Sequence, residues 1–213
     1  MATTVTSADI AVSLRALGLS RGDLCIVHAS MKSFGHVQGG PQAVIDAFET
    51  VLGQEGTLMM PALIQKDFKN AWKAWTPDTP SEVGYLSEYF RCLPGVLRSH
   101  QPSHSVTVRG PLAHEMTFEH AARGPHLCPY GEYAFSDTSP WMKLVERNGF
   151  VIFLGVNMDK CTLKHAVESR FAEGLLAQVR NPARAAELQN RLRRLENYDT
   201  GEFGIWPYFD GIP

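Results

Sequence analysis

The residues best suited to chemistry in this chain are His165 and Glu168, which lie three positions apart in the segment TLKHAVES. We expect a helix there, and side chains three positions apart share one face of a helix. A histidine can accept a proton near neutral pH, and a neighbouring carboxylate can orient it and raise its basicity. Structural and solvent-exposed polar pairs show the same spacing, so the spacing alone leaves both interpretations open.

The element that precedes this pair favours the catalytic interpretation. Residues 150–156 (FVIFLGV) form a short apolar run bounded by Gly149 and Asn157, which predicts a buried strand. The pair follows the carboxyl end of that strand, where open α/β sheets place their ligand sites. We therefore interpret His165 as a candidate general base and Glu168 as the group that orients it.

A second candidate site is the loop after an earlier predicted strand. The apolar segment LCIVHAS leads into the polar loop SMKSFG, and Gly-Gly-Pro precedes a predicted helix over residues 42–52. Backbone N–H groups of such a loop and the helix N-terminus can bind an anion, and Lys32 adds a positive charge. The loop matches neither a Walker loop nor a G-x-G-x-x-G motif. Because strand-to-helix loops also contain glycine for geometric reasons, this signal is weak by itself.

A third polar stretch, LRSHQPSHSVTVRG, places Arg98, His100, His104 and Ser105 within eight residues. Together with His114, its histidines raise the question of a metal site. However, the chain has no H-x-H or H-E-x-x-H spacing, so we expect no metal. A hydrolase that uses Ser105 or Cys161 as nucleophile with His165 is a further hypothesis. It predicts a G-x-S-x-G elbow, which the sequence lacks.

The remaining elements alternate between strands and helices. Strands are predicted over residues 56–61 and 105–108, and helices over residues 8–17, 84–92, 110–120, 140–146 and 183–196. Ser7 is the expected N-cap of the first helix. A long loop over residues 65–80 contains Trp72 and Trp75, which could line a pocket. This alternation predicts an α/β fold, a three-layer α/β/α sandwich with a mainly parallel central sheet.

The composition is that of a folded globular protein. The chain has 213 residues, 44% of them hydrophobic and 20% charged, with a net charge of −2. Neither nucleic acid nor an anionic membrane is an expected partner of such a chain. The cysteines Cys25, Cys92, Cys128 and Cys161 form no disulfide framework, and the N-terminus has no long apolar run. We therefore expect a cytoplasmic protein without a signal peptide or membrane span.

The C-terminal region differs from the rest of the chain. We expect a single domain over residues 1–213, with a core over residues 7–173 and a divergent region over residues 174–213. That region combines a charged helix with an aromatic tail, in which Tyr198, Phe203, Trp206, Tyr208 and Phe209 must cover an apolar surface. The surface could belong to the same domain, to the rim of a cleft or to a second subunit, so a homodimer is an open possibility.

Taken in order, several blocks of this sequence resemble the aminoglycoside 3-N-acetyltransferase family. The blocks are VHASMKSFGHVQGGPQAVIDAF, EGTLMMPAL, GYLSEYF, RSHQPSHSV, TSPWMKLVERNGFVIFLGV and TLKHAVE. Each block is weak alone, but their order over residues 10–170 makes the resemblance specific. It implies an acetyltransferase that uses acetyl-CoA or another acyl-CoA as co-substrate to acylate a small-molecule amine, with no metal.

The resemblance also implies roles for individual residues. It implies that the coenzyme is bordered by Ser30, Met31, Lys32, Ser33, Arg98 and Ser105. His165 would be the catalytic base, with Glu168 beside it, while His104 could touch the coenzyme, join the catalytic network or be structural. Glu88 is an alternative carboxylate for His165. Backbone N–H groups or the hydroxyl groups of Ser105, Thr138 or Ser139 are the candidates for stabilising the oxyanion.

Two departures from the family pattern concern the acceptor. Gln101 occupies the position before Pro102 where the family usually has a histidine, and the chain is shorter than family members generally are. A polycationic aminoglycoside requires clustered carboxylates, whereas the candidates are scattered: Asp67, Asp78, Glu82, Asp137 and Asp159. Antibiotic resistance is therefore one option. A biosynthetic acyltransferase with another amine acceptor, the use of a carrier-protein thioester and a non-catalytic coenzyme A-binding protein are the alternatives.

Overall fold

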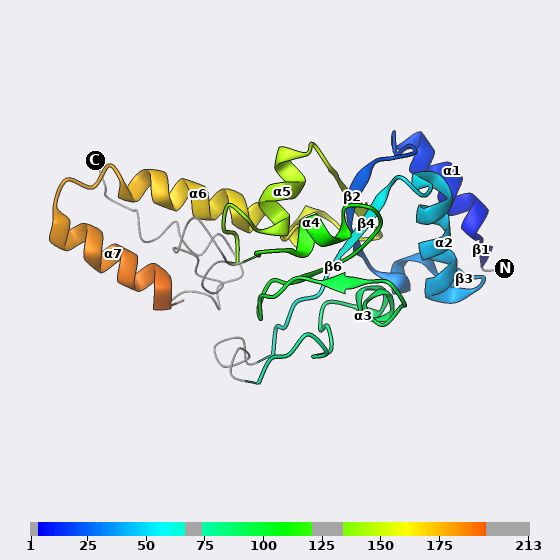
Figure 1. Cartoon of the computed structure of the whole chain (residues 1–213), viewed down its shortest axis with the longest axis horizontal. Coiled ribbons are helices and arrows are strands. Elements are labelled where there is room, and N and C mark those ends of the chain that lie inside the picture. The colour runs from blue at the N-terminus through cyan, green and yellow to red at the C-terminus, as the bar shows by residue number, and fades with distance from the viewer. Residues whose placement is uncertain (1–3, 67–73, 121–133, 195–213) are drawn as a thin grey trace.

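A five-stranded sheet organises the fold, with its strands in the order β5-β6-β4-β2-β7 (Figure 1). The computed structural model describes residues 4–66, 74–120 and 134–194. The strands are β2 (Leu24–Ala29), β4 (Thr57–Pro61), β5 (Leu97–Arg98), β6 (Val106–Arg109) and β7 (Phe150–Leu154). β2 is parallel to β4 and β7, whereas β6 is antiparallel to β4 and β5. The predicted α/β class is confirmed. The sheet is mixed because β6 runs antiparallel to both of its neighbours, β4 and β5. The short connection between β5 and β6 allows only an antiparallel pair.

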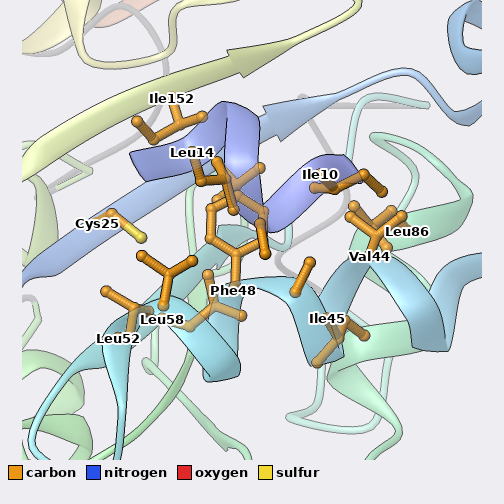
Figure 2. Close-up of a cluster of buried hydrophobic side chains, with 14 of the residues drawn as sticks. Ile10, Leu14, Cys25, Val44, Ile45, Phe48, Leu52, Leu58, Leu86 and Ile152 are labelled. Carbon is orange, nitrogen blue, oxygen red and sulfur yellow. The ribbon is translucent and has the colours of Figure 1, made fainter. Parts of the chain in front are cut away.

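Helices cover both faces of this sheet. One layer contains α1 (Ser7–Ala16), α2 (Gly40–Leu52) and α3 (Tyr85–Arg91), and the other contains α4 (Ala113–Thr117) and α5 (Pro140–Glu146). Successive side chains of β2 alternate between the two cores. Cys25 packs in the first core, which includes Phe48 of α2 (Figure 2), and Ile26 packs in the second core, which includes Trp141 of α5. A strand buried on both faces needs apolar residues at successive positions, which explains its continuous apolar run.

The last two helices lie beyond the sheet. α6 (Lys164–Leu176) and α7 (Pro182–Arg194) form an extension at the end of the molecule opposite α1 and α2 (Figure 1). Between them Ala172 and Leu188 form a small apolar cluster. The aromatic tail and Trp72 lie outside the described residues. Within the part of the chain that the structure describes, no helix is long and apolar enough to cross a membrane.

Several short elements differ from the sequence-based prediction. β1 (Thr4–Val5) and β3 (His36–Val37) pair in parallel as a separate two-stranded sheet, and two residues are too few to show periodicity. α4 covers only part of the predicted helix over residues 110–120, because Phe118 is extended at its C-terminal end. α6 begins at Lys164, inside the segment TLKHAVES, and a 3-10 turn over Met158–Lys160 precedes it.

The N-cap of α1 is Thr6, so the prediction of Ser7 was wrong by one residue. The Thr6 hydroxyl accepts a hydrogen bond from the Asp9 backbone N–H at 3.2 Å, and the Asp9 carboxylate accepts one from the Thr6 backbone N–H at 2.9 Å. This reciprocal capping box satisfies two N–H groups that the helix itself leaves unpaired.

Replacing the two candidate caps separately tests this assignment. Thr6→Ala removes one half of the capping box and is expected to lower the free energy of unfolding by about 1 kcal/mol. Ser7→Ala is the matched control, and it is expected to change that free energy by less than about 0.5 kcal/mol. Urea denaturation followed by circular dichroism measures both. A larger loss for Ser7→Ala than for Thr6→Ala would contradict the observed cap.

Candidate active site

A cavity of about 540 Å³ lies at the carboxyl ends of the three parallel strands. Parallel neighbours end at the same edge of a sheet, so the loops that follow β2, β4 and β7 meet there. The residues that line the cavity include His28, Ala29, Ser30, Met31, Lys32, Pro61, Leu63, Ile64, Glu82, Gly84, Tyr85, Ser103, His104, Asp159, Cys161 and His165. The structure thus places residues of all three candidate stretches around one space: the loop after β2, the stretch that contains His104, and the His-x-x-Glu helix.

His165 and Glu168 form the pair that their spacing predicts. The His165 Nδ1 and the Glu168 Oε2 are 2.7 Å apart in the first turns of α6. The Glu168 side chain is only 3% exposed, whereas that of His165 is 22% exposed and reaches the cavity. When the Nδ1–H group of the neutral ring donates a hydrogen bond to the carboxylate, the basic lone pair of the ring lies on Nε2. The geometry is that of a histidine oriented by a buried carboxylate.

Glu88, the alternative carboxylate, is engaged elsewhere. Its carboxylate accepts hydrogen bonds from the Arg91 guanidinium at 2.7 and 2.8 Å and from the Ser81 backbone N–H. The bond to Arg91 is the main reason why the pKa of Glu88 is lowered to about 2. The structure therefore pairs His165 with Glu168.

His104 lies beside His165 in the cavity wall. The two ring centroids are 6.3 Å apart, and Phe135 packs against both rings. The backbone of His104 is held on both sides, because its N–H donates to the Gln101 side chain and its carbonyl oxygen accepts from the Trp141 indole N–H at 2.9 Å. Gln101, the departure from the family pattern, is thus part of the turn that positions His104.

Ser30, Met31 and Lys32 line the cavity as the loop prediction requires, and Ser33 does not. The Ser33 hydroxyl donates a 2.7 Å hydrogen bond to the Gly155 carbonyl oxygen, which ties the loop after β2 to the loop after β7. Gly155 has a φ of 65°, and a Cβ atom there would collide with the Ser33 side chain. The tie therefore requires glycine at position 155.

Neither Arg98 nor Ser105 is among the cavity-lining residues, although Ser103 and His104 of the same stretch are. The Arg98 guanidinium donates hydrogen bonds to the carbonyl oxygens of Ala62, Pro77 and Thr79 and to the Ser105 hydroxyl. The Ser105 hydroxyl in turn donates to the Ala62 carbonyl oxygen at 2.8 Å. Burial lowers the pKa of Arg98 to about 10. These residues hold the chain after β4 in place behind the cavity wall.

The other hydroxyl candidates for oxyanion stabilisation are also absent from the cavity lining. Ser139 is buried and accepts a hydrogen bond from the Met142 backbone N–H, so it caps α5. Thr138 lies 3.4 Å from the Ser136 hydroxyl. Among the described residues, no group of three or more histidine, cysteine, aspartate or glutamate side chains is placed to hold a metal ion.

His28 is the cavity residue that sequence reasoning missed. It is 6% exposed near the end of β2, and its ring lies nearly parallel to those of Phe153 and Trp141. Burial lowers its pKa to about 4, so the ring is neutral at neutral pH. Its Nε2 has no hydrogen-bond partner in the described parts of the chain, an arrangement that typically costs ~1–3 kcal/mol. The available signal was a histidine inside an otherwise apolar strand.

His120 is a buried histidine of the opposite kind. Its two ring nitrogens lie 2.8 Å from the Ser99 hydroxyl and 2.9 Å from the Ala134 carbonyl oxygen. Burial lowers its pKa to about 4 as well. His120 is therefore a fully hydrogen-bonded core residue, and the comparison shows that the unpaired Nε2 of His28 is not a general feature of buried histidines here.

The mixed sheet and the histidine–carboxylate pair at the carboxyl ends of its parallel strands define an α/β protein with a candidate general-base site. The chain belongs to the aminoglycoside 3-N-acetyltransferase family, because the sequence pattern of that family matches residues 26–204. This match confirms the family resemblance seen in the sequence blocks.

Individual relatives agree with this membership. The chain is 32% identical to aminoglycoside N(3)-acetyltransferase VIII of Streptomyces fradiae over 78% of its own length, and it spans 61% of the length of that relative. It is also 32% identical to aminoglycoside N(3)-acetyltransferase III of Pseudomonas aeruginosa, with 92% of this chain and 76% of that one aligned. The structure of AAC-IIIb in a binary complex with CoASH is 30% identical, with a TM-score of 0.68 over 78% of this chain and 65% of that one.

The structural role of Arg98 leads to a stability prediction. Arg98→Met leaves three carbonyl oxygens without their charged donor and is expected to lower the free energy of unfolding by roughly 3 kcal/mol. Arg15→Met on the exposed face of α1 is the control, expected to stay within about 0.5 kcal/mol of wild type. Urea denaturation measures both changes. Equal stability of the two variants would show that the Arg98 network is not structural.

Proposed function

We propose that this protein is an acyl-coenzyme A-dependent N-acyltransferase that transfers an acetyl group, or another acyl group, to an amine. The observation that carries the proposal is the His165–Glu168 pair, 2.7 Å apart, in the wall of a cavity that the Ser30–Lys32 loop also lines. The relatives named as aminoglycoside acetyltransferases and the CoASH-bound neighbour support the same reaction. Residues 7–173 are the proposed family-like core.

The loop after β2 is the proposed donor site. The Ser30 hydroxyl, the backbone N–H groups of Met31 and Lys32, the apolar Met31 side chain and the positive charge of Lys32 suit the phosphates and the pantetheine arm of coenzyme A. The Ser30 backbone N–H instead donates a 2.9 Å hydrogen bond to the Leu154 carbonyl oxygen. Ser33 supports this loop through its bond to Gly155. Arg98 and Ser105 support the donor site indirectly. Both donate hydrogen bonds to the carbonyl oxygen of Ala62, which follows the cavity residue Pro61.

The proposed reaction begins with a proton transfer. An acceptor amine is mostly an ammonium ion at neutral pH, so His165 removes one proton at Nε2 while Glu168 stabilises the charged ring. The amine nitrogen then attacks the thioester carbonyl carbon, and the carbonyl π electrons move to the oxygen. When the C=O bond re-forms, the C–S bond breaks and the coenzyme leaves as a thiolate. His165 returns its proton to that sulfur, and the nitrogen releases its second proton to solvent, so the product is a neutral amide that carries the acyl group.

The acceptor is proposed to be an amine of an aminoglycoside-like molecule, as in the named relatives. Of the five scattered carboxylates, Glu82 and Asp159 line the cavity. Glu82 already accepts hydrogen bonds from the Gln65 and Lys66 backbone N–H groups, and Asp137 is paired with Arg170. The described cavity wall therefore offers few carboxylates for a polycation, so simpler amines belong in the substrate test.

A cytoplasmic location is part of the same proposal. Cys25, Cys92 and Cys161 are free thiols, which fits a reducing compartment that also supplies coenzyme A thioesters.

A thiol-release assay with acetyl-CoA tests the base. The assay uses a panel of aminoglycosides and simple amines. His165→Ala is expected to lower kcat by ~10²–10⁴-fold, because the amine loses its proton acceptor. Glu168→Gln is expected to lower kcat less, because the histidine remains but loses its charged partner. His114→Ala, on the exposed surface of α4, is the control and should keep wild-type turnover.

The possible outcomes of this assay separate the hypotheses. The proposal is supported if the wild type acetylates an aminoglycoside and kcat falls only in the His165 and Glu168 variants. Turnover on simple amines alone would move the acceptor towards biosynthesis. Coenzyme binding without turnover on any amine would favour a carrier-protein partner or a non-catalytic role. Unchanged kcat in His165→Ala would refute the assigned base.

Lys32 provides a separate test of the donor site. Lys32→Gln removes an exposed positive charge and is expected to raise the Kd for CoASH by roughly 3–10-fold at low salt. The difference from wild type should shrink at 0.5 M salt, because ions screen an exposed charge pair. Isothermal titration calorimetry measures both, with Arg15→Gln as the matched control. A salt-independent or absent effect would remove Lys32 from the phosphate site.

A further inference from the structure

His28 is the last but one residue of β2, and it is continuous with the loop proposed to hold the coenzyme. The residues from His28 to Lys32 all line the cavity, and His28 is the most buried of them. The polar loop residues would meet the outer part of a coenzyme arm. His28 then stands at the inner end of the same wall, where the reactive thioester end of that arm belongs.

The ring of His28 is held rigidly in apolar surroundings. The Phe153 ring lies 5.6 Å away at an interplanar angle of 17°, and the Trp141 ring lies 6.4 Å away at 23°. Two nearly parallel neighbours fix the plane of the imidazole, so its N–H group has a defined direction. A neutral imidazole carries one N–H donor and one acceptor nitrogen, and the pKa of about 4 keeps the ring in that form at neutral pH.

His28 and His165 belong to one packed cluster of rings. Phe135 lies 6.0 Å from Trp141 and 6.2 Å from His165, measured between ring centroids, and Trp141 stacks on His28. The two histidines therefore approach the cavity from neighbouring positions. They differ in chemistry, because only His165 has a carboxylate partner at Nδ1.

We propose that the neutral ring of His28 donates a hydrogen bond to the carbonyl oxygen of the bound acyl thioester and stabilises the oxyanion formed when the amine attacks. This assignment rests on the proposed acyltransferase function. The attack forms the N–C bond and moves the carbonyl π electrons to the oxygen, where a preorganised donor stabilises them. When the C=O bond re-forms and the C–S bond breaks, the donor keeps its proton. His28 thus polarises the carbonyl, while His165 moves the proton.

The proposal explains why a buried nitrogen lacks a partner in the protein itself. His120 shows that this fold can satisfy both nitrogens of a buried histidine. At His28 the buried Nε2 instead has no partner among the described residues, although the residue itself lines the cavity. A polar atom that pairs only with a ligand lowers the stability of the ligand-free protein, as functional groups often do.

A binding experiment tests the proposal without relying on turnover. The probes are acetyl-CoA and S-ethyl-CoA, which differ only in the carbonyl oxygen. Wild type is expected to bind acetyl-CoA about 5-fold more tightly, the effect of one hydrogen bond. His28→Phe keeps the stacked ring and removes the donor, so it should bind S-ethyl-CoA like wild type and show no preference. If His28→Phe keeps the preference, the proposal is wrong.

Kinetics and stability supply a second decision. His28→Phe is expected to lower kcat about 10²-fold, the usual loss for one oxyanion donor, while its melting temperature stays equal to that of wild type or rises. His28→Gln and His28→Asn restore an N–H donor and one of them should recover part of kcat. His120→Phe is the matched buried control, expected to lose stability. A destabilised His28→Phe with normal kcat per folded molecule would identify His28 as a packing residue and overturn the proposal.

The same data separate this inference from the function on which it rests. If wild type binds neither probe, the acyl-CoA function and the role of His28 fall together. If wild type binds both probes but acylates no amine, the transferase proposal fails at the acceptor. The ratio of the two dissociation constants in wild type and His28→Phe still decides whether His28 contacts the carbonyl oxygen.

Discussion

The parallel pairing of β2 with β4 on one side and β7 on the other is the constraint on which the rest of the structure depends. It directs three carboxyl ends to one edge of the sheet, in the registers Ile26↔Met59 and His28↔Phe153. Residues more than a hundred positions apart, such as Lys32 and His165, thereby line one cavity. Neither the loop after β2 nor the helix after β7 could form this site alone.

The sequence predicted the parts of the site that depend on local geometry. The spacing of His165 and Glu168 required only a helix, and the position of Lys32 required only a strand followed by a loop. It did not predict the direction of Arg98, because the carbonyl oxygens that bind it belong to segments 19 to 36 positions away. A polar residue close to a site in sequence can therefore either contact the ligand or support the cavity wall. Only the long-range contacts of the residue distinguish these two roles.

The fold was predictable to a similar depth. The central strand β2, buried on both faces, was visible as an apolar run, and so was the half-buried edge strand β7. The two-residue strands β1 and β3 lacked any period. His28 was not predicted for a related reason, because an apolar run indicates a core position for each of its residues. Gln101 was noticed only as a departure from a family pattern. Its contact with the His104 backbone gives that departure a structural meaning.

The hydrogen bond between the Ser33 hydroxyl and the Gly155 carbonyl oxygen joins positions 122 residues apart in the chain. In evolutionary terms, it couples two segments, the loop after β2 and the loop that leads from β7 to α6. A larger residue at 155 would displace Ser33, and a larger residue at 33 would press on the turn at 155. Descendants of this protein can therefore diversify elsewhere around the cavity, but these two positions are expected to change together.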